Sequence, residues 1–295
     1  MRQGDTLSPK LFNAGLEQVF RMLKWDNKGI TINGEKFNHL RFADDIVLIG
    51  NNGEEAKEML NELNRESNKL GMKINMRKTK VMYNDYASIM PIHVGTQEVE
   101  KVNDYVYLGQ LVTMKNDKSD EIKRRIAAGW GAFGRYRDIL KSKMPLSLKR
   151  KVYNQCIQAA MTYGCQTWAV TKRMQDRLKT TQRSMERAML GITRRDHRTN
   201  EWVRQQTGVQ DIIVRIKQLK WQWAGHVARI NDDRWTRTVT EWLPIHLKRK
   251  KARPKMRWED DIKKYIEVIC MRVARDRNNW KHHEEAFIQQ WIDNG

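Results

Sequence analysis

The chain has 295 residues, of which 40% are hydrophobic and three are cysteine; this is enough apolar content for a buried core and too few cysteines for a disulfide framework. Its formal net charge of +21 indicates a polyanionic partner, and nucleic acid is the leading candidate because the basic segments alternate with ordinary core-forming helices. The sequence has no run near the roughly 18 apolar residues of a membrane span and no secretory signal, so we expect an intracellular protein without a membrane partner.

The N-terminal third alternates helical and extended patterns. Apolar spacing predicts a helix from Pro9 to about Leu23, with Ser8 as its N-cap. Two hairpins follow: the first turns at Asn33-Gly34, and the second covers residues 42–50. We therefore expect a sheet to begin directly after the first helix.

A second predicted helix begins at Asn52, which with Glu55 resembles a capping box, and ends at Gly71. Its apolar face should cover a mostly antiparallel sheet whose last strands reach Thr113. The pattern up to residue 115 thus predicts an α+β region.

From Ser119 onward the periodicity is helical and predicts three packed helices, the last ending at Gly191. An arginine-rich linker and a helix around Ile212–Trp223 come next, and nine of the eleven tryptophans lie between Trp168 and Trp291. These tryptophans could stack on bases or form a core.

The most informative stretch is Phe42-Ala43-Asp44-Asp45, which places two adjacent carboxylates at the bend of the second hairpin. Aspartate is common in turns for local reasons, so the pair alone is weak evidence for a functional site. Carboxylate oxygens at such a tip can also hold a divalent metal ion beside a phosphate. Its neighbours in the sequence favour this second interpretation.

Four blocks follow one another in the order Arg2–Asn13, Phe42–Asp45, Gly71–Asn75 with Lys78-Thr79, and Tyr105–Gly109. In this order they resemble the palm motifs lettered B, C, D and E in reverse transcriptases of non-LTR (LINE-type, RTE- or jockey-like) retrotransposons. Further on, residues 253–261 resemble the basic, tryptophan-containing tail beyond the polymerase in animal elements of this kind.

The resemblance implies a partial palm over residues 1–115, a helical thumb over 116–192 and a basic, mostly helical tail over 193–295. It also implies an RNA-directed DNA polymerase that uses Mg²⁺, deoxynucleoside triphosphates, an RNA template and a DNA primer. In such nucleotidyl transfer two divalent ions clamp the attacking and leaving oxygens.

Residue roles also come from the resemblance. Asp44 would be the main metal ligand, with Asp45 beside the metal. Gln3, Gly4 and Phe42 would lie against the incoming nucleotide, the template and the primer end, whereas Tyr107, Leu108 and Gly109 would form the primer grip. Lys78 would act at the departing pyrophosphate, although Arg77 and Lys80 are close enough to take that role.

Polymerases of this family draw their other essential carboxylate from a motif upstream of the Gln3-Gly4 block. Because catalytic groups of this kind act as a set, we expect this chain alone to be inactive. The alternative is a non-catalytic nucleic-acid-binding protein derived from such an element.

The densest basic clusters are Lys123-Arg124-Arg125, Lys149-Arg150-Lys151, Arg194-Arg195 and Lys248-Arg249-Lys250-Lys251. The first two lie on predicted thumb helices, where they would contact the phosphates of an RNA:DNA duplex; a solvated basic face is the alternative. The last run also resembles a nuclear localisation signal, so we expect the protein in the nucleus and the cytoplasm.

Overall fold

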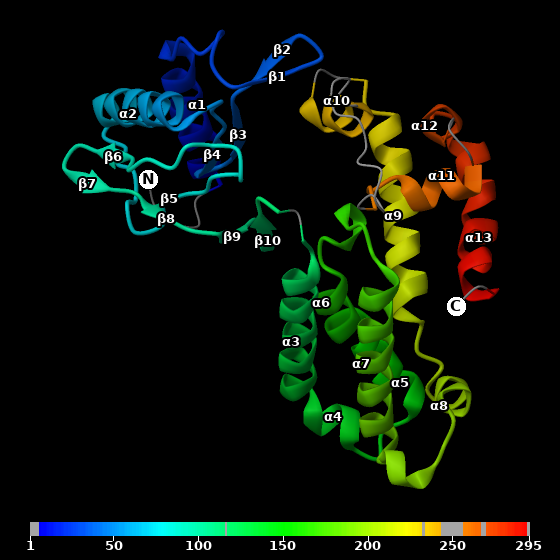
Figure 1. Cartoon of the computed structure of the whole chain (residues 1–295). Helices are drawn as coiled ribbons and strands as arrows, with labels where there is room; N and C mark the ends of the chain where they lie inside the picture. The colour runs from blue at the N-terminus through cyan, green and yellow to red at the C-terminus, as the bar shows by residue number, and fades with distance from the viewer. Residues whose placement is uncertain (1–5, 116, 232–233, 243–255, 267–269, 294–295) are drawn as a thin grey trace. The chain divides into compact units, whose positions relative to one another are not determined.

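The computed structural model describes residues 6–115, 117–231, 234–242, 256–266 and 270–293 (Figure 1). They form two compact units. The N-terminal unit comprises residues 1–116 with 238–243, and the C-terminal unit comprises residues 117–237 with 244–295. No helix in the described ranges is long and apolar enough to cross a membrane.

Two helices dominate the N-terminal unit. Helix α1 (Ser8–Met22) matches the predicted position, but Leu7 is its N-cap and Ser8 is already helical, so the predicted cap was wrong. Helix α2 (Gly53–Lys69) begins as predicted, with the Asn52 side chain accepting a hydrogen bond from the Glu55 N–H at 2.9 Å. The helices pack through a buried cluster of Leu16, Val19, Phe20, Trp25, Met59 and Leu63.

The strands form five two-stranded ladders. The pairs are β1 (Ile30–Ile32) with β2 (Glu35–Phe37), β3 (His39–Phe42) with β4 (Asp45–Leu48), β5 (Lys80–Val81) with β8 (Glu100–Lys101), β6 (His93–Val94) with β7 (Gln97–Glu98), and β9 (Asp104–Tyr107) with β10 (Gln110–Thr113). The α+β class is confirmed, whereas the single antiparallel sheet was wrong and β5–β8 is parallel. Asn38 separates strand β2 from strand β3, and its side chain donates to the Trp25 carbonyl oxygen at 2.9 Å.

His39 anchors β3 against α1. Its ring lies 4.6 Å from the Phe20 ring and 5.9 Å from the Trp25 ring. Burial, assisted by the nearby charge of Arg41, lowers the pKa of His39 to about 4. His39 is therefore a neutral packing residue at neutral pH.

The C-terminal unit is helical. Its main elements are α3 (Ser119–Arg135), α4 (Arg137–Lys141), α5 (Leu146–Val152), α6 (Ala159–Thr162), α7 (Lys172–Leu190), α8 (Asn200–Thr207), α9 (Ile212–Ala228), α11 (Asp260–Ile266), α12 (Cys270–Val273) and α13 (Arg277–Asp293). The residues of α10 (Trp235–Glu241), which follows α9 in the chain, are divided between the two units. The short turns η2 (Cys165–Thr167) and η3 (Arg194–Asp196) connect them.

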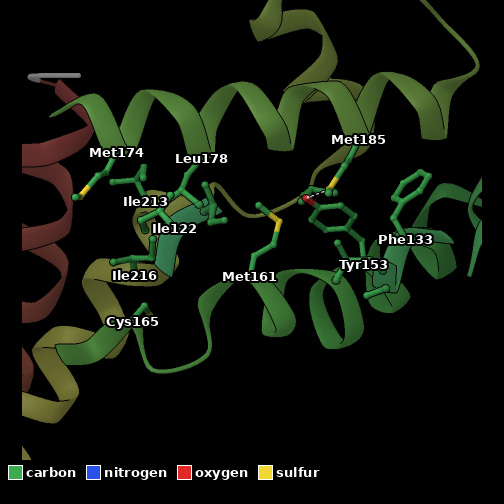
Figure 2. Packing of buried hydrophobic residues seen from close by; sticks show 14 of the residues in the cluster. Ile122, Phe133, Tyr153, Met161, Cys165, Met174, Leu178, Met185, Ile213 and Ile216 are labelled. Atoms are coloured by element: carbon green, nitrogen blue, oxygen red, sulfur yellow. Dashed lines mark hydrogen bonds between the residues drawn. The ribbon is translucent and has the colours of Figure 1, made fainter. Parts of the chain in front are cut away.

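The larger core of this unit lies between α3, α6, α7 and α9 (Figure 2). Met174, Leu178 and Met185 project from α7 at helical spacing and meet Met161 of α6 and Ile213 of α9. Apolar residues on both sides of the predicted 192/193 boundary share this core. The division of the chain into a thumb and a tail stays a prediction.

Between α5 and α6 the chain adopts a π-helix, η1 (Tyr153–Gln158). Tyr153 and Ile157 of this segment are fully buried, and the Tyr153 hydroxyl donates to Met185 Sδ at 3.6 Å (Figure 2). The Gln158 side chain donates to the Gln210 carbonyl oxygen at 2.8 Å. The segment thus ties this part of the core to the start of α9.

A second core forms around the C-terminal half of α9. The indoles of Trp221 and Trp280 stack at 3.7 Å, and each donates its N–H to the backbone carbonyl oxygen of the other residue. Because indole N–H groups are satisfied when buried, this reciprocal pair fixes α13 on α9. Base stacking is excluded for these two side chains, since both are buried.

Asp261 of α11 lies between two buried lysines of α9. One carboxylate oxygen accepts a hydrogen bond from Lys217 Nζ, and the other lies 2.7 Å from Lys220 Nζ. Burial alone would raise the pKa of Asp261, but the charges of Lys220 and Lys217 hold it below its usual value. The acidic residues of the 253–261 motif therefore include an internal counter-ion.

Asp261→Ala should lower the free energy of unfolding of the C-terminal unit by about 3–5 kcal/mol, because it leaves two ammonium groups buried without a counter-ion. Urea denaturation measures this loss. The control Asp120→Ala removes an exposed ion pair with Lys123 and should have a much smaller effect. Equal losses in the two variants would contradict the internal role of Asp261.

The N-terminal unit should lose stability as the pH falls from about 6.5 to about 4. In this window His39 becomes protonated in the unfolded chain but stays neutral in the folded unit. Hydrogen exchange of the backbone amides of β3 and β4, corrected for intrinsic rates, measures this. His39→Gln should reduce the pH dependence. An unchanged dependence in the variant would argue against the buried histidine as its source.

Candidate active site and nucleic-acid interface

Asp44 and Asp45 lie at the tip of the β3–β4 hairpin. Phe42 pairs with Asp45, so Ala43 and Asp44 form the two-residue turn, and Ala43 has a φ of +52°. Both carboxylates are exposed. The tight turn thus presents two neighbouring acidic side chains to solvent, as the sequence predicted.

The hairpin is held from below by α1 and α2. Ile46 and Leu48 of β4 pack against the buried cluster between these helices. Arg41 of β3 forms an ion pair with Glu17 of α1 at 2.9 Å and lies 4.2 Å above the Phe20 ring. These contacts fix the direction in which the tip projects.

A second tight turn lies beside the carboxylates. In the β9–β10 hairpin Tyr107 pairs with Gln110, which leaves Leu108 and Gly109 as the turn, with φ of +47° and +75°. Glycine adopts this backbone freely, but a leucine there is strained. Burial raises the pKa of Tyr107, and the negative charge of Asp45 raises it further.

The segment with Lys78 attaches to the same strand. The Tyr105 hydroxyl donates to the backbone carbonyl oxygen of Lys78 at 3.1 Å. Tyr105 and Tyr107 are two residues apart on β9, so they lie on one face of that strand. This face joins the neighbourhood of Asp45 to the turn around Lys78, and Tyr105 is a site residue that the analysis of the sequence did not assign.

The structure separates the three basic residues considered for the pyrophosphate. Lys80 forms an ion pair with Glu100 across the β5–β8 ladder. Arg77 and Lys78 are exposed. Lys80 therefore has a structural partner, which favours the other two for contact with a ligand.

The remaining predicted contacts to nucleotide and template divide in two. Phe42 is 63% exposed at the end of β3, next to the acidic turn. Gln3 and Gly4 lie outside the described residues.

The acidic tip suits a hard cation in chemistry. Carboxylate oxygens are the ligands that Mg²⁺ prefers, and both side chains are accessible. In the described ranges no group of three acidic, histidine or cysteine side chains that could hold a metal comes together. The residues present can thus provide two neighbouring carboxylates of a metal site.

The basic clusters on α3 and α5 are partly internal. Arg125 is 7% exposed and binds the buried Glu121 at 2.6 Å, and Arg124 binds the same carboxylate. Lys149 is 5% exposed and donates to the Met189 carbonyl oxygen near the end of α7 at 3.2 Å. These buried charges stabilise helices rather than face a ligand.

The exposed members of the two clusters are Lys123, Arg150 and Lys151, with Arg124 half-buried. Lys123 also forms an exposed ion pair with Asp120. The run Lys248-Arg249-Lys250-Lys251 lies outside the described residues. The sequence could not separate these groups, because three successive basic residues on a helix point in directions about 100° apart and the spacing does not tell which of them faces the core.

Comparisons with known proteins agree with this arrangement. A family model described as reverse transcriptase (RNA-dependent DNA polymerase) matches residues 1–113. An uncharacterized transposon-derived protein of Caenorhabditis elegans is 36% identical over 266 residues, which cover 84% of this chain and 95% of that protein.

A second relative is the retrovirus-related Pol polyprotein from the type-1 retrotransposable element R2 of Nasonia vitripennis. It is 31% identical over 121 residues, which cover 37% of this chain and 12% of the polyprotein. The residues that match the family model include all four blocks of the predicted palm. The chain therefore belongs to the reverse transcriptase family of non-LTR retrotransposons.

Proposed function

We propose that this chain is a nucleic-acid-binding portion of a non-LTR retrotransposon reverse transcriptase, in which residues 1–115 form part of the palm, 116–192 the thumb and 193–295 a basic tail. The observation that carries the proposal is the exposed pair Asp44 and Asp45 at the tip of the β3–β4 hairpin, within the 113 residues that match the reverse transcriptase family model. The N-terminal unit also contains the candidate primer-grip turn at Leu108 and Gly109.

Asp44 and Asp45 would hold Mg²⁺ through their exposed carboxylates. When bound, the metal would supply the positive charge that clamps the attacking and leaving oxygens of an in-line phosphoryl displacement. Phe42 at the adjoining strand end would pack near the primer terminus, and Gln3 and Gly4 would lie against nucleotide and template.

The turn of Tyr107, Leu108 and Gly109 would position the primer end. Leu108 combines a strained backbone with a side chain that is 39% exposed, and strain of this kind concentrates at functional sites. Arg77 and Lys78 would contact the departing pyrophosphate, since Lys80 is paired with Glu100. The partners would be an RNA template, a DNA primer and deoxynucleoside triphosphates, in the nucleus and cytoplasm.

We propose that the chain does not polymerise alone. Among the described residues the acidic tip provides two carboxylates, and two-ion displacement needs more oxygen ligands than these. Nucleotidyl transfer would then belong to the larger parent polyprotein.

A non-catalytic nucleic-acid-binding role is the second candidate function. The net charge of +21 favours it, because this charge would support binding to a polyanion whether or not chemistry follows. The two candidate functions differ in whether Asp44 binds a metal ion.

Asp44→Asn should weaken binding of Mn²⁺, used as a spectroscopic probe for Mg²⁺, by at least about tenfold, because loss of even an outer-shell group costs about that much. Electron paramagnetic resonance of free Mn²⁺ gives the affinity. The matched control is Asp85→Asn, an exposed aspartate in another turn of the same unit. Equal affinities in both variants would reject Asp44 as a ligand and favour the non-catalytic role.

The purified chain should bind an RNA:DNA primer-template without extending it in the presence of magnesium and nucleotides. Binding should weaken with salt, and Lys151→Gln should reduce the slope of log affinity against log salt by about 0.9, the share of one phosphate contact. Lys172→Gln on α7 is the matched control and should leave the slope unchanged. Robust synthesis by the chain would refute the proposed inactivity.

A further inference from the structure

A basic cavity of about 680 Å³ lies between α7, the η3–α8 segment and α9. Its floor is apolar and comprises Val209, Ile213, Val214 and Ile288. Its other lining residues include lysines and arginines, which form the rim, and Asp211 is the one acidic residue among the lining residues. The cavity therefore combines an apolar surface with a positively charged rim.

Acidic residues neutralise some of the positive charges that line the cavity. Asp211 accepts from Arg183 at 2.9 Å and from Arg204, and Glu186 binds Arg183 from the buried side. Lys217 is bound to Asp261. These residues form the frame of the cavity rather than its ligand-binding charge.

Three other rim residues keep their charge: Lys179, Arg187 and Arg194. None of them forms an ion pair with an acidic residue in the described part of the chain. Arg187 Nη2 donates to two neutral acceptors, the Arg198 carbonyl oxygen at 3.1 Å and Asn200 Oδ1 at 3.0 Å. Its guanidinium is thus held in place without being neutralised, and its buried Nε has no partner.

The rim is elongated. Lys179 and Arg187 are eight residues apart on one face of α7, which corresponds to about 12 Å along the helix. Arg194 follows α7 in the chain, in η3, and lines the same cavity. A row of separated cations suits several linked phosphates better than one free phosphate, because each phosphate can then meet its own cation.

We infer that this cavity binds an unpaired nucleic-acid strand, with successive phosphates along Lys179, Arg187 and Arg194 and a base on the apolar floor. A base held in a stacked duplex cannot enter such a cavity, whereas an unpaired base can pack its face on apolar side chains. The inference rests on the proposed nucleic-acid-binding function and assigns it a second site, separate from the duplex contacts of Lys123 and Lys151.

The test is fluorescence anisotropy of a labelled oligouridylate with the full chain across a salt series. Lys179→Gln combined with Arg194→Gln should weaken binding about tenfold and reduce the salt slope by about 1.4, two single-strand phosphate contacts. Arg187 stays unchanged because its hydrogen bonds support the η3–α8 segment. The matched control, Lys172→Gln with Arg135→Gln, removes the same charge from exposed positions that do not line the cavity.

Two further probes separate the parts of the inference. An abasic strand of equal length should bind about tenfold more weakly than oligouridylate, because it lacks the stacking base. An RNA:DNA duplex should bind the cavity variant and the control equally. Thermal melting of both variants checks that they remain folded.

These measurements distinguish failure of the cavity site from failure of the proposed function. Equal oligouridylate binding by the two double variants, or equal binding of the abasic strand by the wild type, would overturn the cavity site. If the wild-type chain binds the duplex but not the single strand, this inference fails and the proposed function stands. If it binds neither, the proposed function fails as well.

Discussion

The C-terminal unit is organised by two buried lysines on α9 that share one carboxylate. Lys217 and Lys220 lie between the part of α9 that packs on α7 and the part that packs on α13. Burying two ammonium groups side by side is costly without a counter-charge, and Asp261 of α11 provides this charge at this point of α9. The stacked tryptophans and α13 can then close the second core around the same helix.

In the N-terminal unit, strand β9 has a comparable organising role. One of its faces carries Tyr107, whose pKa is raised by burial and by the charge of Asp45, and Tyr105, which donates to the backbone of Lys78. In the proposed function, these two tyrosines on one face of β9 connect the candidate primer grip to the segment with Lys78. Asp45 and Tyr107 each lie at the end of a short hairpin, and the β3–β4 hairpin is positioned by its packing on α1 and α2.

The sequence predicted what depends on local order: the α+β class, the hairpin with Asp44, the helices α1, α2, α3, α7 and α9, and the family. It did not predict the burial of Arg125 and Lys149, because periodicity marks a helix face without telling which basic side chain finds an internal acceptor. The ladders, the counter-ion role of Asp261 and the basic cavity also arise from contacts between distant segments. Such contacts leave no trace in residue spacing.

The π-helix at Tyr153–Gln158 has a consequence for how this chain can change in evolution. A π turn closes its hydrogen bonds over one residue more than an α turn, so the segment amounts to an insertion that the helix has absorbed. Deleting one residue here would convert the π turn into a regular α turn, and the side chains on either side of the segment would keep their directions. Met161 would stay in the core, so related sequences can lack the extra residue of this segment and still keep the packing of the helices around it.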